Sequence, residues 1–164
     1  MIWESRTSTA PSFVALNTTL ARDLQRGGKD VNGQTPQRAT SDGGTIPCRH
    51  CLTPVGKGED YLILAHRPFP EAQPFAETGP IFLHAKECSR AIASGKPAPM
   101  FQLGGSYILR GYSQNHWINY DAAEVVTPEK LTETARRLLS RNDVAYVHMR
   151  SSKMNCYQCR IERV

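Results

Sequence analysis

The feature that most constrains the fold is the shortness of the apolar runs, each of which glycine, proline or polar residues interrupt. The run 61–65 is far below the roughly 20 residues that a membrane-spanning helix needs. Short runs rich in Leu, Ile, Phe and Tyr between turn residues are typical of strands. We predict strands over residues 13–16, 59–66, 80–84, 106–112, 117–120, 144–150 and 156–163.

Helix signals are fewer and lie between these runs. Asn17 is a good N-cap for a helix that ends near Gly27, a short helix is expected over residues 85–92, and a third begins at Thr127. The expected buried face of the third helix consists of Leu131, Ala135, Leu138 and Leu139. Hairpin-like neighbours without regular alternation of strand and helix predict an α+β fold, with a mainly antiparallel sheet and two or three helices.

Length and composition indicate one domain. We expect a flexible N-terminal lead-in over residues 1–12 and a single α+β domain over 13–164, with a long loop over 29–47 whose role the sequence does not disclose. We see neither a membrane span nor a secretory signal, so we expect a cytoplasmic protein.

The net charge of +5 comes from scattered basic residues, which makes nucleic-acid binding the less favoured interpretation.

The sharpest motif is a C-x2-C pair, Cys48 and Cys51, which His84 and Cys88 follow at i, i+4 spacing. Two cysteines in a tight turn can present both sulfurs to one ion, and zinc prefers four thiolate or imidazole ligands. We therefore predict a treble-clef-like zinc knuckle at Cys48, Cys51, His84 and Cys88. A closed shell of four protein ligands is normally structural, because no coordination position remains for a substrate.

Two alternatives stay open for these residues. Cysteines are often small buried hydrophobes. A histidine such as His50 or His84 can also activate a thiol, so Cys51 or Cys88 could serve as a nucleophile in acyl or thiol transfer, with His84 as the base.

The second C-x2-C, at Cys156 and Cys159, carries less weight. In a regular strand, residues three apart point to opposite faces, so the two sulfurs could not bind one ion. Strand alternation places Tyr157, Cys159 and Ile161 in the core, and whether either cysteine joins a site stays open.

A row of polar side chains suggests a second site. Alternation along the strand 144–150 places Tyr146, His148 and Arg150 on one face, which could line an anion pocket. The simpler interpretation is a polar outer face of a sheet. For a ligand, we expect capture near Arg67, Arg110, Tyr112 and His148.

Several segments together resemble a bacterial family known only as domain of unknown function number 1203. The resemblance covers most of residues 13–164 and rests on segments 47–52, 67–69, 77–85, 109–112 and 155–160. It implies no activity.

We therefore expect a small cytoplasmic binding or interaction module with a structural zinc or thiol site. Its partner would be a small anionic ligand or another protein, and a homo-oligomer stays open. A Cys/His-dependent enzyme is the alternative.

Overall fold

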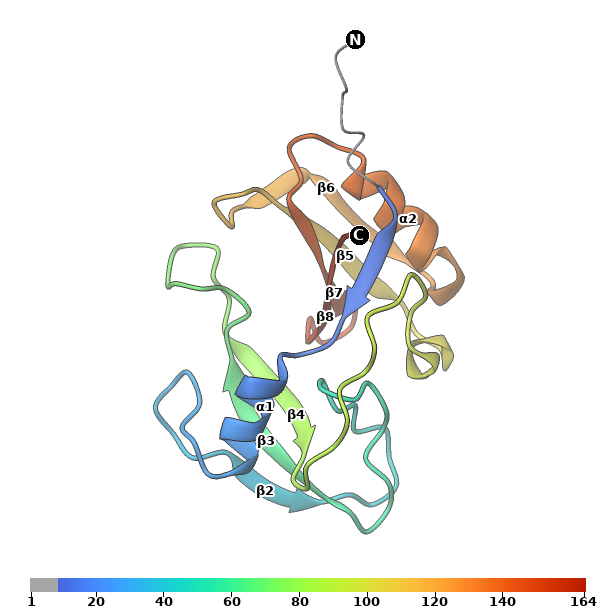
Figure 1. Ribbon diagram of the computed structural model, residues 1–164. Coiled ribbons are helices and arrows are strands. Elements are labelled where there is room, and N and C mark those ends of the chain that lie inside the picture. Colours follow the sequence, from blue (N-terminus) through green and yellow to red (C-terminus); the bar gives the residue numbers. More distant parts are fainter. Residues whose placement is uncertain (1–8) are drawn as a thin grey trace.

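Two antiparallel sheets form the framework of the protein. The computed structural model describes residues 9–164 and places a five-stranded sheet above a three-stranded sheet in the view of Figure 1. The larger sheet has the order β1-β8-β7-β5-β6 and the smaller β2-β3-β4, and every neighbouring pair is antiparallel. The strands are β1 (Pro11–Val14), β2 (Gln37–Thr40), β3 (Asp60–His66), β4 (Gly79–His84), β5 (Tyr107–Tyr112), β6 (Ile118–Val126), β7 (Tyr146–Ser151) and β8 (Tyr157–Arg163). The predicted α+β class is confirmed.

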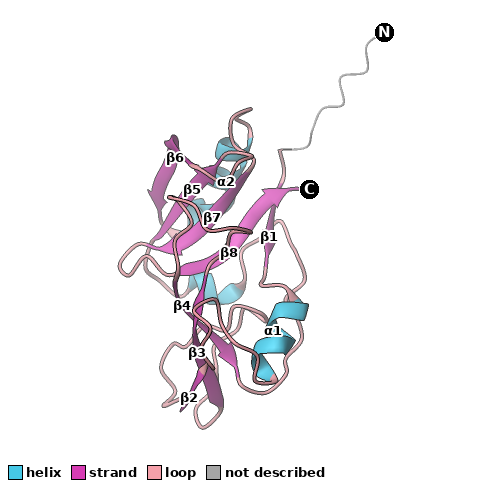
Figure 2. Ribbon diagram, turned by 90° about the vertical axis from the view of Figure 1, so that its left-hand side faces the viewer, coloured by secondary structure: helices cyan, strands magenta, loops and turns pink. Residues whose placement is uncertain are grey.

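Two α-helices accompany the sheets, one for each (Figure 2). Helix α1 (Thr18–Gln25) begins as predicted, because the Asn17 side chain accepts a hydrogen bond from the backbone N–H of Leu20. Helix α2 (Leu131–Leu139) follows a 3-10 turn, η2 (Pro128–Lys130), and another 3-10 turn, η1 (Pro99–Gln102), lies farther upstream. The four residues predicted for the buried face of α2 are all buried.

The protein has two main hydrophobic cores. The first lies between α2 and the five-stranded sheet, and the second joins α1 to β3 and β4. Strand β8 contributes side chains to both cores. Its pairing with β7 skips Gln158, so that Met149 lies opposite Cys159 and Arg150 lies opposite Tyr157. This bulge turns Tyr157 into the second core and leaves Cys159 in the first, so the prediction that the two share a face is wrong.

The predicted loop over residues 29–47 contains a strand. Strand β2 pairs with β3 from Gln37 to Thr40, although its side chains are mostly exposed and polar. Backbone hydrogen bonds form this edge strand without an apolar pattern, so the sequence did not signal it. Asp30 fixes the start of the segment, since its carboxylate accepts the N–H groups of Asn32, Gln34 and Ala65.

The helix predicted over residues 85–92 is absent, and the segment is irregular. Its carbonyls bind side chains of α1 instead of helical N–H groups. Arg22 donates to the carbonyl of Cys88 at 2.6 Å, and Gln25 donates to the carbonyls of His84 and Lys86. Because these carbonyls accept hydrogen bonds from α1 side chains, they are not used for the backbone hydrogen bonds of a helix. No helix within residues 9–164 is long and apolar enough to cross a membrane.

Close packing at Gly111, in the middle of β5, gives a test of this framework. A Cβ at Gly111 would lie 2.9 Å from the Ala122 Cβ and 3.1 Å from Val144 Cγ2. We expect Gly111→Ala to lower the free energy of unfolding by about 1–3 kcal/mol through overpacking. Urea denaturation measures it. Gly79→Ala is the matched control, since nothing lies within 4 Å of its Cβ, and equal effects of the two substitutions would contradict the packing.

Candidate metal centre and the buried arginine cluster

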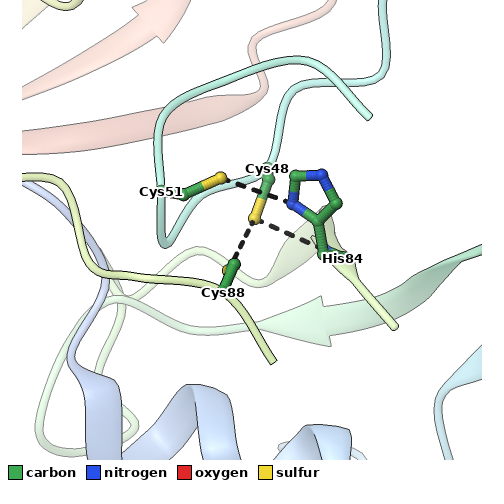
Figure 3. A group of neighbouring side chains, drawn as sticks. All are labelled: Cys48, Cys51, His84 and Cys88. Carbon is green, nitrogen blue, oxygen red and sulfur yellow. Dashed lines mark hydrogen bonds between the residues drawn. The ribbon is translucent and has the colours of Figure 1, made fainter. Parts of the chain in front are cut away.

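Three separate segments bring four candidate metal ligands together. Cys48 and Cys51 lie on a tight turn, His84 ends β4, and Cys88 lies in the irregular segment that follows (Figure 3). One ligand atom from each residue lies within 4.8 Å of all the others. The four residues therefore could hold a metal ion.

The geometry fits a tetrahedral site. The Cys48 and Cys88 sulfurs are 3.9 Å apart, and the Cys51 sulfur is 3.3 Å from His84 Nδ1. Zinc–sulfur bonds of about 2.3 Å give a tetrahedral edge of about 3.8 Å, close to the first distance. The other ring nitrogen, His84 Nε2, lies 3.7 Å from a carboxylate oxygen of Glu59, which is too far for a hydrogen bond.

The backbone of the turn prepares the sulfurs for this role. The Leu52 N–H donates to the Cys48 carbonyl at 3.0 Å, and Leu52 itself has a φ of 55°. The His84 backbone N–H also donates to the Cys48 sulfur at 3.3 Å. An N–H directed at sulfur stabilises a thiolate, which is the form that binds metal.

The three thiols of the centre do not ionise independently. Hydrogen bonds from Cys48 and Cys88 lower the pKa of Cys51, while hydrogen bonding with Cys51 raises that of Cys48. Hydrogen bonding with the other two thiols, together with burial, raises the pKa of Cys88. Of the three thiols, Cys51 is therefore the one whose ionised form its neighbours favour.

Two buried residues next to the candidate ligands were not expected from the sequence to be part of the centre. His50 is fully buried, with Nδ1 3.1 Å from the Cys88 sulfur and Nε2 2.8 Å from the Thr18 hydroxyl. Arg49 is also buried, and its guanidinium donates to the carbonyls of Tyr157 and Pro47 at 2.6 and 2.7 Å. Burial lowers the pKa of Arg49 to about 10. His50 was visible as a thiol neighbour, whereas nothing in the sequence pattern indicated a buried Arg49.

Cys156 and Cys159 lie outside this group of ligands. Cys159 is buried with its sulfur 3.9 Å from the Met149 sulfur, and burial raises its pKa to about 12. Cys156 is half-buried, with its sulfur 3.7 Å from the Met154 carbonyl.

Three of the four predicted ligand-binding residues, Arg110, Tyr112 and His148, lie close together on β5 and β7. Tyr112 and His148 are fully buried, with ring centroids 4.8 Å apart. Arg110 lies opposite His148 in the pairing of β5 with β7 and interacts with Tyr112, and its Nη1 also pairs with Glu77 at 2.6 Å. Among the described residues, the buried Arg67 Nε and His148 Nδ1 have no hydrogen-bond partner.

The row Tyr146, His148 and Arg150 is buried, so the simpler interpretation of a polar outer face is wrong. Strand β7 is central in its sheet, and both of its faces are covered. Rings continue from the row towards the smaller sheet: His148 lies 5.0 Å from Tyr157, which lies 5.5 Å from His66 at the end of β3. Polar residues of this cluster therefore fill the junction between the sheets.

The histidines at this junction are held neutral. Burial, Arg150 and Arg160 lower the pKa of His148 well below its ordinary value. Burial, with Arg49 and Arg150 nearby, lowers the pKa of His66 to about 4. Neither ring therefore adds positive charge to the arginines around it near neutral pH.

The low pKa of His66 predicts acid lability. Because the folded pKa of about 4 lies below the unfolded value of 6.5, the unfolded chain binds more protons between them. The contribution of His66 to stability is thus complete above pH 6.5 and is lost as the pH falls towards 4. Between pH 7 and 5 we expect the wild type to lose about 2 kcal/mol more than His66→Gln, measured by urea denaturation. Parallel pH curves for the two proteins would contradict this.

Comparison with known proteins gives a family but no function. No curated protein and no solved structure matches the chain. One family model matches residues 45–163, which include all four candidate metal ligands, and its description is "Protein of unknown function (DUF1203)". The match spans well over half of the sequence, and the chain therefore belongs to the DUF1203 family.

Proposed function

We propose that the protein is a binding module whose fold depends on a structural zinc ion held by Cys48, Cys51, His84 and Cys88. The observation that carries this proposal is the convergence of the four ligand atoms within 4.8 Å from three segments. Three thiolates and one imidazole are a donor set that zinc favours, and they leave no position for a substrate.

The surroundings of the four residues support zinc over a plain thiol cluster. A zinc ion with three thiolates and a neutral imidazole carries one net negative charge. Arg49 supplies a buried positive charge next to Cys48, and Cys48 is among the neighbours that favour the charged form of Arg49. A buried guanidinium whose hydrogen-bond partners are two neutral carbonyls gains much from such a neighbour.

The binding role belongs to the junction between the sheets, where the zinc ion would hold the 46–56 loop in place. Arg67, Arg110, Tyr112 and His148 are the proposed ligand-binding residues, and a small anion or a protein partner is the proposed ligand. Buried polar atoms of Arg67 and His148 that find no hydrogen-bond partner within residues 9–164 support a polar ligand there. Nucleic acid is less favoured, since Arg22, Arg26, Arg137 and Arg160 already pair with carboxylates.

Metal content tests the zinc proposal. We expect close to one zinc ion per chain by elemental mass spectrometry of protein prepared without added metal. Cys48→Ser should abolish the zinc and lower the free energy of unfolding by more than about 4 kcal/mol, as loss of a structural metal does. Cys156→Ser, which removes a thiol outside the centre, should keep the zinc. Metal-free wild-type protein that stays folded would sink the proposal.

One observation favours a second candidate, a Cys/His-dependent transferase. Cys51 is only half-buried, and its sulfur lies 3.3 Å from a ring nitrogen of His84, as in a nucleophile–base pair. Such an enzyme would use a free Cys51 thiol for acyl or thiol transfer.

Alkylation separates the two candidates. In the zinc-bound protein we expect iodoacetamide to modify Cys51 at least about tenfold more slowly than after chelation of the metal, because a coordinated thiolate is shielded. Peptide mass spectrometry over time measures the rate, with Cys156 as the internal reference. Rapid modification of Cys51 in untreated protein would favour the enzyme.

A further inference from the structure

A cavity of about 460 Å³ lies where the two sheets meet, beside the buried arginine cluster. Its wall combines the end of β3, the start of β4 and the turn between β7 and β8. Its lining includes Glu77, Pro80, Arg150, Asn155 and Tyr157. Of the four ligand-binding residues expected from the sequence, none lines this cavity, whereas Arg150 does.

Arg150 has two guanidinium nitrogens that lack an acceptor among residues 9–164. Its side chain is only 5% exposed. Its Nη1 donates to the Asn155 carbonyl at 3.2 Å, but Nε and Nη2 are buried and have no hydrogen-bond partner in the part of the chain that the structure describes. The Nε and Nη2 hydrogens of a guanidinium are parallel and match the two oxygens of a carboxylate.

The charges around the cavity leave room for an anion. Glu77 is shared, with one oxygen 2.6 Å from Arg110 Nη1 and the other 3.5 Å from Arg150 Nη1. Among residues 9–164, Arg150 forms no ion pair other than the one with Glu77. The single carboxylate of Glu77 is therefore shared between two guanidinium groups, and buried positive charge without a full counter-charge is costly.

We propose that this cavity binds a small organic monocarboxylate, whose carboxylate group pairs with the Nε/Nη2 edge of Arg150. This proposal rests on the binding role proposed above for the junction between the sheets. It names the ligand class and places the carboxylate at Arg150, in the same strand as His148, rather than on the four residues named there. Pro68, Pro80, Met154 and Tyr157 also line the cavity and offer apolar contact to the rest of the molecule. A phosphate dianion fits less well, because Glu77 would repel its second charge.

Access to the guanidinium edge requires a local movement. The Nε and Nη2 atoms have almost no exposed surface, so the wall must shift for a ligand to reach them. The turn that ends at Asn155 is an exposed part of that wall, since Met154 is 70% exposed. The hydrogen bond from Asn155 to Glu77 is long, at 3.4 Å, and gives way at little cost.

The test uses the full-length, zinc-loaded protein and sodium benzoate as the probe. Titration monitored by ¹H–¹⁵N correlation spectra should give saturable shifts at Glu77, Cys156 and Tyr157, with a dissociation constant below about 10 mM. Sodium phosphate and benzyl alcohol, which lack the carboxylate, should bind at least about tenfold more weakly. Absence of saturable benzoate shifts, or equal binding of phosphate, would overturn the proposal.

Variants then identify the partner of the carboxylate. Arg150→Gln should weaken benzoate binding at least about tenfold, and Arg150→Lys at least about fivefold, because lysine keeps the charge but lacks the paired donors. Glu77→Gln should tighten binding about threefold or more by removing the competing carboxylate. Unchanged affinity in Arg150→Gln would refute the assignment. Where the spectrum shows that variant to be misfolded, Arg150→Lys and Glu77→Gln decide, and unchanged affinity in both refutes it.

Zinc measured on the same samples separates this result from the proposed function. Zinc-loaded protein that ignores benzoate overturns the carboxylate site alone. Metal-free protein that binds benzoate with the expected variant effects overturns the structural zinc and supports the carboxylate site.

Discussion

Arg49 holds the candidate metal centre to the rest of the fold. Its backbone N–H donates to the Phe82 carbonyl in β4, and its carbonyl accepts from Leu16, just after β1. Its side chain donates to the carbonyl of Tyr157 in β8 at 2.6 Å. One residue next to Cys48 thus ties the metal turn to both sheets. The buried guanidinium of Arg49 keeps its hydrogen bonds only while the acceptor carbonyls stay in place. The position of the turn and the position of the sheets therefore depend on each other.

The bulge in β8 is what allows two sheets to share one strand. With Gln158 left out of the pairing, Tyr157 leaves the face that Cys159 and Ile161 occupy and joins the core of the smaller sheet. The same change of face brings the Tyr157 carbonyl to Arg49 and its ring to His148. The polar junction and the metal turn therefore share one irregular residue pair, which strand alternation alone does not reveal.

The sequence predicted those parts of the fold in which local chemistry decides. Asn17 caps α1, the buried stripe of α2 follows its period, and the four residues Cys48, Cys51, His84 and Cys88 meet in space. Prediction failed where contacts distant in sequence take over. Arg22 and Gln25 capture carbonyls that a helix over residues 85–92 would use, and β2 forms on backbone hydrogen bonds alone.

Burial was the hardest property to anticipate. Polar residues such as His148 and Arg150 read as a solvated face, because alternation shows which residues share a side but not what covers that side. The covering residues, Phe69 and Tyr157, come from a loop of the smaller sheet and from the bulged end of β8. Only their approach in three dimensions makes the row an interior feature.

Strand β4 connects the two sites proposed for this protein. Gly79 and Pro80, at its start, line the cavity beside Arg150, and His84, at its end, lies among the candidate zinc ligands. A strand of six residues between them is a stiff connection, held along its length by pairing with β3. A zinc ion at His84 would fix the end of this strand and so the wall of the cavity about 17 Å away along the chain, at 3.4 Å for each residue. Such a metal would be structural in its coordination and would also set the shape of the proposed binding site. The closed ligand shell and the cavity would then depend on the same strand.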